Sequence, residues 1–181
     1  PRLYYEDWTA SQLAEAGIKP KQFIAVSSGA TWDTKKWPMA NWQQLCRALA
    51  NDGHTVVQVG HNDSRIEAVH DLVDRTTVRD VACVLRHAQL LVCNDSGLMH
   101  LALAVGTPVL GLFGPTNAAM LVRASTKLLA MTNGRNCQGC WNSPTVQMTE
   151  GTCPLNITSC METLTVDSVL EGARELLGHA A

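Results

Sequence analysis

The sequence lacks an excess of charge of either sign, a long apolar run, an internal repeat and any low-complexity segment. Its formal net charge is −2 and its Lys and Arg residues form no stripe, which argues against nucleic acid as a partner. No apolar run approaches the roughly 20 residues that a membrane span requires. No basic start followed by an apolar stretch marks a signal peptide. We therefore expect a soluble, cytoplasmic protein.

The chain is long and apolar enough to bury one substantial core. It has 181 residues, of which 46% are hydrophobic and 17% are charged. This size predicts a single domain over residues 1–181. The opening segment, PRLYYEDWTASQLAEAG, resembles a linker that leads into a helix, and it begins at Pro1 rather than at Met. We expect the chain to be a piece of a longer protein.

Strand-like and helix-like segments alternate along the chain. Short apolar runs predict strands at residues 23–28, 55–60, 90–93, 109–113 and 127–131. Helical periodicity predicts helices at residues 42–49, 66–73, 78–85 and 98–105, and a last helix capped by Thr165. Alternating apolar strands and helices are typical of a parallel sheet covered on both faces, which is a Rossmann-like α/β fold. In such a fold, ligands bind in the loops after residues 28, 60, 93 and 113.

The junction at residues 94–97, Asn-Asp-Ser-Gly, joins a strand directly to a helix. The unpaired N–H groups and the positive dipole end of that helix make an anion site, for which a diphosphate is the natural ligand. Gly97 would let a phosphate approach the backbone, Ser96 can donate a hydrogen bond, and His100 faces the same pocket. Alternatively, Asp95 or Ser96 merely caps the helix and His100 is a buried, hydrogen-bonded histidine.

Two further loops bring polar residues to the same edge of the sheet. The loop after the first strand carries Thr31, Lys35 and Lys36, and a lysine there could neutralise phosphate charge. Alternatively, both lysines are simply solvated. The loop after the fourth strand supplies Gly114 and Thr116 beside the junction, although a Gly-Pro turn is common in any loop.

The loop after the second strand, GHNDSRIE, offers two acids, Asp63 and Glu67. An acid in this place of a nucleotide-binding fold often accepts hydrogen bonds from a ribose. Asp63 could instead cap a following helix.

Three motifs together resemble one family. They are K-x-W-P at residues 35–38, DSGxxH at residues 95–100 and GTPVLGLFGPT at residues 106–116. In order and spacing they resemble the ADP-heptose heptosyltransferases of glycosyltransferase family nine, which have two Rossmann-like domains in the GT-B arrangement. The resemblance runs from Phe23 to the last helix. It implies that the chain is the C-terminal half, which binds the nucleotide-sugar donor.

The resemblance also implies roles for individual residues. Asp95 would hold the sugar or the loop, and Thr76 would lie near the adenine. Phosphate contacts would come from Thr31, Lys35, Ser96, Gly97 and His100.

The implied reaction transfers heptose with inversion to a lipopolysaccharide core or a protein, at the inner face of the inner membrane. We expect direct displacement at the anomeric carbon. Lys35, His100 and the helix N-terminus would stabilise the departing diphosphate, so no catalytic cofactor or metal is needed. The resemblance assigns the catalytic base and the acceptor cleft to an N-terminal domain that we do not find in this sequence.

The seven cysteines fall into two groups. Cys46, Cys83 and Cys93 lie at apolar positions and are expected in the core. The other four lie in a polar loop, begin with a CxxC pair and suit one tetrahedral zinc or iron site: Cys137, Cys140, Cys153 and Cys160. Some members of the resembled family hold iron in a similar quartet. The alternatives are two disulfides or four free thiols.

Two other functions fit parts of the sequence. A stand-alone nucleotide-binding module would use the same anion site without catalysis. A sugar-nucleotide epimerase of the same architecture would place more acidic and histidine side chains within one cleft, and the DSGxxH and K-x-W-P pair argues against it.

Overall fold

The computed structural model describes residues 13–67, 69–122, 125–142, 152–153 and 160–178. Its centre is a six-stranded sheet in the order β3-β2-β1-β4-β5-β6, in which every neighbouring pair is parallel. The strands are β1 (Phe23–Ser27), β2 (Thr55–Gln58), β3 (His70–Asp71), β4 (Leu90–Asn94), β5 (Val109–Leu112) and β6 (Leu128–Met131). The Rossmann-like α/β prediction is confirmed.

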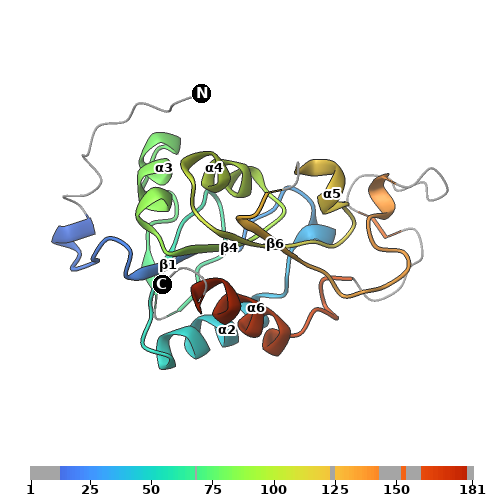
Figure 1. The fold of residues 1–181 in the computed structure, drawn as a ribbon, viewed down its shortest axis with the longest axis horizontal. Coiled ribbons are helices and arrows are strands. Elements are labelled where there is room, and N and C mark those ends of the chain that lie inside the picture. Colours follow the sequence, from blue (N-terminus) through green and yellow to red (C-terminus); the bar gives the residue numbers. More distant parts are fainter. Residues whose placement is uncertain (1–12, 68, 123–124, 143–151, 154–159, 179–181) are drawn as a thin grey trace.

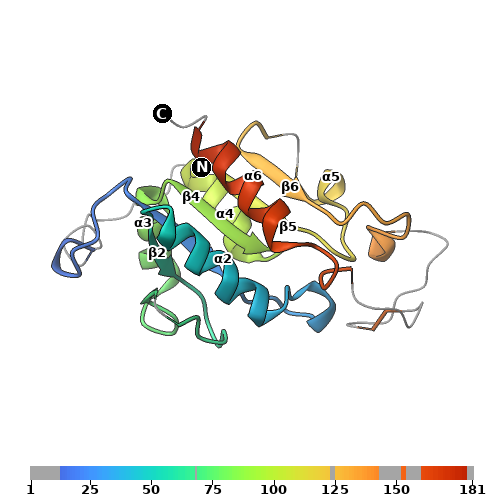
Figure 2. The ribbon, with the colours of Figure 1, turned by 90° about the horizontal axis from the view of Figure 1, so that it is seen from below.

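Helices cover both faces of the sheet (Figure 1). One face carries α3 (Val78–His87) and α4 (Gly97–Val105), and the other carries α2 (Met39–Asn51) and α6 (Val166–Gly178). Seen from below, α2 and α6 run side by side across the strands (Figure 2). The shorter helices are α5 (Ala118–Leu121) and the 3-10 turns η1 (Asp33–Lys35) and η2 (Cys140–Asn142). None of the helices in the described part of the chain is long and apolar enough to cross a bilayer.

Strict alternation along β1 builds the core on both faces. Ile24 and Val26 point into the cluster under α2 and α6, whereas Phe23 and Ala25 point into the cluster under α3 and α4. All four side chains are fully buried. A strand with two buried faces is apolar throughout, which explains why these strands read as unbroken apolar runs. The three cysteines predicted in the core, Cys46, Cys83 and Cys93, are buried there.

The predicted helix over residues 66–73 is wrong. The described residues of this segment form a loop and then β3, which pairs with β2 at the edge of the sheet. The loop is held by Gln58, whose buried side chain accepts a hydrogen bond from Ile66 N (2.8 Å) and donates one to Ser64 O (2.8 Å). These bonds satisfy backbone groups that a helix would otherwise pair, so the apolar spacing of Ile66 and Val73 reflects burial of single residues rather than helical period.

The strand order places a topological switch point between β1 and β4. From β1 the chain moves outward to β2 and β3, and it then returns to β4 on the other side of β1. In such sheets the loops that leave the two central strands diverge and open a crevice at the carboxyl edge. The loop after β1, which carries Thr31 and Lys35, and the junction after β4 at residues 95–97 leave the sheet at this point.

Candidate functional site

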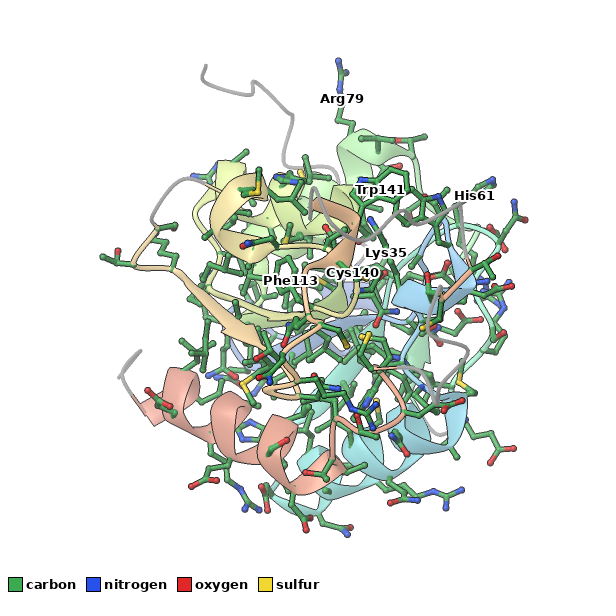
Figure 3. All side chains as sticks on the ribbon, turned by 90° about the vertical axis from the view of Figure 1, so that its right-hand side faces the viewer. Lys35, His61, Arg79, Phe113, Cys140 and Trp141 are labelled. Carbon is green, nitrogen blue, oxygen red and sulfur yellow. The ribbon has the colours of Figure 1, made fainter. Side chains whose placement is uncertain are left out.

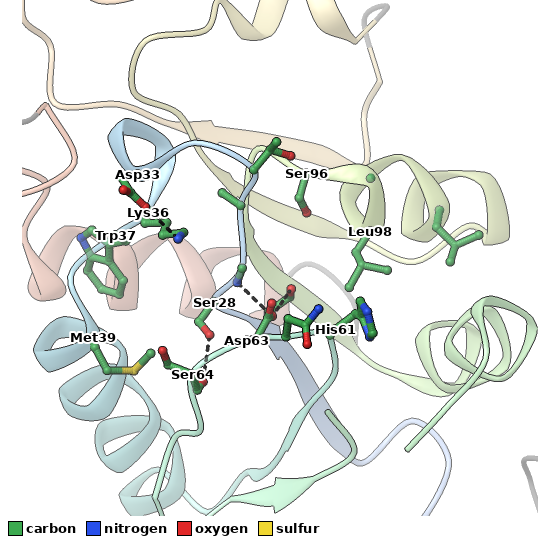
Figure 4. Close-up of a pocket in the computed structure, with 18 of the residues that line it drawn as sticks. Ser28, Asp33, Lys36, Trp37, Met39, His61, Asp63, Ser64, Ser96 and Leu98 are labelled. Carbon is green, nitrogen blue, oxygen red and sulfur yellow. Dashed lines mark hydrogen bonds and ion pairs between the residues drawn. The ribbon is translucent and has the colours of Figure 1, made fainter. Parts of the chain in front are cut away.

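A cavity of about 1040 Å³ opens at the carboxyl ends of the central strands (Figure 4). Its walls are the loop after β1, the loop after β2, the start of α3, the first turn of α4 and Glu162. The predicted site residues that line it are Thr31, Asp63, Ser96, Gly97 and His100. Lys35, Thr76, Asp95 and Thr116 are not among the lining residues, and each has a different position described below.

The N-terminus of α4 faces the cavity, and the hydroxyl of its N-cap residue makes no hydrogen bond within the described part of the chain. Ser96 is the N-cap residue, but its side chain makes no capping bond, and its buried hydroxyl has no hydrogen-bond partner among the described residues. A methyl group on Gly97 would meet nothing within 4 Å, so the backbone is open to a ligand. His100 is exposed and lines the same space. This arrangement differs from a merely capped helix with a buried histidine, and it suits an anion.

Asp95 lies behind this turn as the centre of a buried polar cluster. Its carboxylate accepts a hydrogen bond from Lys35 Nζ (2.7 Å) and another from Thr116 Oγ1 (2.8 Å). The side chains of Asp95 and Lys35 are only 6% and 16% exposed. The ammonium also lies 4.5 Å from the centre of the Trp32 ring. The predicted phosphate ligand Lys35 is therefore held by an internal carboxylate, next to the cavity wall.

Lys36 lines the cavity, whereas Lys35 does not. Its ammonium pairs with Asp33 at 2.8 Å, and both residues line the cavity (Figure 4). The pair is solvent-exposed, with side chains that are 48% and 90% accessible, so it contributes little to stability. The adjacent lysines thus have different environments, because η1 turns one side chain inward and leaves the next at the surface.

Asp63 fills the gap between the first two loops. Its carboxylate accepts hydrogen bonds from Gly29 N (3.0 Å) and Ser27 Oγ (3.5 Å). A methyl group on Gly29 or Gly60 would collide with it, so both glycines are needed for this approach. Burial raises the pKa of the Asp63 carboxyl, while the hydrogen bonds from Gly29 and Ser27 oppose that rise.

The two candidate acids are separated by the structure. Asp63 lines the cavity, whereas the exposed Glu67 lies outside it and pairs with Arg47 at 3.5 Å. Asp63 does not cap a helix, because a loop and β3 follow it.

Thr76 lies just before the start of α3 and outside the cavity lining. Its hydroxyl donates to Leu72 O at 3.3 Å, and the N-cap of α3 is its neighbour Thr77, which forms a capping box with Asp80. Val78, the first residue of the helix, is 74% exposed and lines the cavity. The start of α3 thus presents an apolar side chain to the cavity.

Asn94 organises the site, although no functional role was predicted for it. It is fully buried at the end of β4, donates from Nδ2 to Ser28 O (2.8 Å), and accepts from Trp37 N (3.2 Å) through Oδ1. Trp37 is itself anchored, because its Nε1 donates to Leu164 O at 2.8 Å. One amide therefore joins the first strand's loop to the junction. The sequence signal that could have identified Asn94 is its position as a polar residue directly after the apolar run at residues 90–93.

The four loop cysteines are half-buried, and their side chains lie near one another. Burial raises the pKa of Cys160, and the neighbouring thiols Cys140, Cys137 and Cys153 add to that rise. Burial likewise raises the pKa of Cys140, with further contributions from Cys137 and Cys153. Within the described ranges, no three His, Cys, Asp or Glu side chains are grouped as a metal site would need. The disulfide alternative is not seen at these four residues.

Sequence comparison identifies relatives of one kind. The pattern of glycosyltransferase family 9 (heptosyltransferase) matches residues 4–149. Lipopolysaccharide heptosyltransferase 1 of Pseudomonas aeruginosa is 34% identical over 115 residues, which cover 59% of this chain and 32% of that protein. The chain spans about a third of the length of that protein and of the heptosyltransferase 1 of Salmonella typhimurium, which it also matches.

Solved structures share the fold. The ADP-heptose lipopolysaccharide heptosyltransferase II of Escherichia coli superposes with a TM-score of 0.74 at 20% identity, over 98% of this chain and 53% of that one. TibC of enterotoxigenic E. coli, described as a dodecameric iron-containing heptosyltransferase, was solved in complex with ADP-D-beta-D-heptose. It superposes with a TM-score of 0.78 at 17% identity, and the superposition covers all of this chain and 47% of the TibC chain. At these identities the likeness concerns the fold alone.

Proposed function

The chain belongs to glycosyltransferase family 9, the heptosyltransferases, and from this premise we propose that it is the donor-binding part of a longer, inverting heptosyltransferase. The donor would be a nucleotide-sugar of the ADP-heptose type. The acceptor would be a lipopolysaccharide core or a protein, bound by a second domain that also supplies the catalytic base. The share of the relatives' length that the chain covers is compatible with such a division.

The observation that carries the proposal is the Ser96 hydroxyl at the N-terminus of α4, which makes no capping bond. A buried hydroxyl without a partner is costly, and such groups in folded proteins are commonly completed by a ligand or water. The Ser96 hydroxyl has no partner among the described residues and borders a cavity of about 1040 Å³. A diphosphate at this turn would accept hydrogen bonds from Ser96 and from the first N–H groups of α4, and it would complement the helix dipole. His100 would add a donor one turn further on.

The nucleoside would extend from this point along the cavity. Asp63 is the acid that we assign to the ribose hydroxyls, because it lines the cavity and Glu67 does not. Its carboxylate already accepts from Gly29 and Ser27, so a ribose would add a third hydrogen bond to a partly desolvated group. Val78 offers an apolar surface for a base. Thr76 would act on the base through the position of α3.

Lys35 would stabilise the leaving group. With no ligand, its charge is largely neutralised by Asp95, so a diphosphate must compete for the ammonium. Two phosphate charges offer a stronger partner than one carboxylate. We propose that donor binding draws Lys35 Nζ toward the phosphate. The Asp95 carboxylate would keep its bond from Thr116 and could accept a hydrogen bond from the sugar.

The proposed reaction is one displacement at the anomeric carbon. The acceptor oxygen forms a bond to that carbon while the bond to the phosphate oxygen breaks, and the electron pair departs with ADP. The acceptor's proton passes to the base in the second domain. Lys35, His100 and the N-terminus of α4 stabilise the charge that develops on the departing diphosphate.

Calorimetric titration with ADP, UDP and GDP tests the binding assignment. We expect saturable binding that is selective for ADP. Ser96→Ala and His100→Ala should each weaken it by about 10- to 150-fold, which is the effect of one hydrogen bond to a charged group. His54→Ala, which removes a histidine outside the cavity lining, is the matched control. If none of the nucleotides binds, or if Ser96→Ala binds ADP as tightly as the parent, the diphosphate assignment is wrong.

We further propose that Cys137, Cys140, Cys153 and Cys160 hold one structural metal ion, either zinc or iron. Four thiolates are a suitable donor set for both metals, and the mutual influence of the thiols on their pKa values supports their proximity. Metal analysis of the reduced chain after exposure to Zn²⁺ or Fe²⁺ should give one ion per chain. The ion should be lost in Cys153→Ser and retained in Cys46→Ser, which changes a core cysteine. Stoichiometric metal in Cys153→Ser would contradict the assignment.

A further inference from the structure

Two tryptophans from distant parts of the chain pack against each other at the edge of the site. Trp32 lies just before η1, and Trp141 lies in η2 beside Cys140. Their ring centres are 4.3 Å apart, with the ring planes inclined at 56°. Figure 3 shows Trp141, Cys140 and Lys35 gathered at one end of the molecule. The pair therefore joins the loop of the candidate phosphate site to the loop of the four cysteines.

The Trp32 ring also carries the Lys35 ammonium on its face. The distance from Nζ to the ring centre is 4.5 Å, within the range of a cation–π interaction. Asp95 holds the same ammonium at 2.7 Å. Lys35 thus has one carboxylate and one ring as partners, and its side chain is only 16% exposed. A long, flexible lysine loses much of its rotamer freedom when it is held in this way, which prepares the charge for a ligand.

Trp141 is fixed by the backbone that also fixes Asp95. Trp141 N donates to Pro115 O at 2.8 Å, and Gly139 N donates to Gly114 O at 3.3 Å. Thr116, which follows Pro115, donates a hydrogen bond from its hydroxyl to the Asp95 carboxylate. The short segment 114–116 therefore positions both the Asp95 carboxylate and Trp141. The Trp32 ring is confined by Trp141, whose own side chain is still 38% exposed.

We infer that Trp32 and Trp141 are positioning residues that hold Lys35 Nζ beside the diphosphate site, within reach of the bound phosphate, an inference that rests on the proposed function. Trp32 acts directly through its ring face. Trp141 acts by keeping the Trp32 ring beneath the ammonium. The cysteine loop is in this way coupled to donor binding through one aromatic contact.

The expected signature is a loss of ADP affinity that depends on Lys35. Trp32→Leu removes the ring and should weaken ADP binding by about 3- to 10-fold, the range of a partly buried cation–π contact. Trp141→Leu keeps an apolar side chain but lets the Trp32 ring move, and should weaken binding by about 2- to 5-fold. Trp141→Phe retains a ring and should restore affinity to within about twofold of the parent.

The experiment is calorimetric titration with ADP of these variants in two backgrounds, the parent and Lys35→Met. In Lys35→Met, the tryptophan substitutions should have no further effect on affinity, because the charge that they position is gone. Near-ultraviolet circular dichroism should show the loss of the tryptophan pair in both backgrounds. Far-ultraviolet circular dichroism checks that each variant is folded.

Each outcome decides a separate point. Equal affinity losses in both backgrounds would mean that the tryptophans only support the loop, and would overturn the inference. Parent-like affinity in Trp32→Leu would also overturn it. If the Leu variants at position 141 do not fold, Trp32→Leu and Trp141→Phe still give the comparison. A parent chain that fails to bind ADP would instead overturn the proposed function, and the inference with it.

Discussion

The buried pair between Lys35 and Asp95 should make Lys35→Met a strongly destabilising change. At 2.7 Å and an effective dielectric constant of 20, the attraction between the two charges is about 6 kcal/mol before desolvation is counted. Lys35→Met removes this attraction but leaves the carboxylate 6% exposed, with only the Thr116 hydroxyl as a hydrogen-bond partner. Removing one partner of a buried pair costs about 3–5 kcal/mol.

Water reduces this cost at Lys35. Its side chain is 16% exposed, so water can enter when the lysine is removed, and we expect Lys35→Met to lower the free energy of unfolding by about 2–3 kcal/mol. For a chain of this size, that corresponds to a fall in Tm of about 4–12 °C. Asp95→Asn should cost only about 1 kcal/mol, because Asn still accepts from Thr116 and the freed ammonium can reach water.

The double variant isolates the pair. Lys35→Met combined with Asp95→Asn leaves no buried charge, so it should unfold at a higher urea concentration than Lys35→Met alone. Urea unfolding and thermal unfolding, both followed by circular dichroism, measure the parent, the two single variants and the double variant. Lys19→Met, a change at an exposed lysine, is the matched control. A Tm for Lys35→Met within 2 °C of the parent, or a double variant less stable than Lys35→Met, would refute the reasoning.

Three further predictions concern the walls of the cavity. Because the pKa of Asp63 is raised in the folded state, the stability that this carboxyl contributes is complete below pH 3.8 and is lost as pH rises through the folded pKa. Asp63→Asn should therefore gain stability relative to the parent between pH 3.5 and pH 7 in urea titrations. A stability difference that stays constant over this range would contradict the prediction. Asn94→Leu leaves two buried backbone groups unpaired and should lower the free energy of unfolding by about 2–4 kcal/mol, against a negligible change for the exposed Asn51→Leu. Gly60→Ala forces the Asp63 carboxylate aside and should weaken ADP binding at least fivefold by calorimetry, whereas Gly178→Ala, which meets nothing within 4 Å, should bind ADP as the parent does.

The positions of most elements follow from local sequence alone. Runs such as residues 23–26 and 90–93 are apolar at every position because both faces of a parallel strand are buried. The α4 junction was equally predictable, since Asn-Asp-Ser-Gly between a buried apolar run and an apolar helical segment indicates a helix N-terminus at the sheet edge. Strand β3 could not be predicted from the sequence. It has two residues, and the apolar spacing before it imitates a helix.

Which side chains meet at the site was decided by the tertiary structure. Nothing local distinguishes Lys35 from Lys36, yet one is held by a carboxylate 60 residues away and the other lies at the surface. Asp63 meets Gly29 only because β1 and β2 are neighbours in the sheet. Trp32 and Trp141 belong to loops that share no pattern in sequence. Periodicity and turn chemistry act over a few residues and determine the elements, whereas these contacts join segments that only the packed sheet brings together.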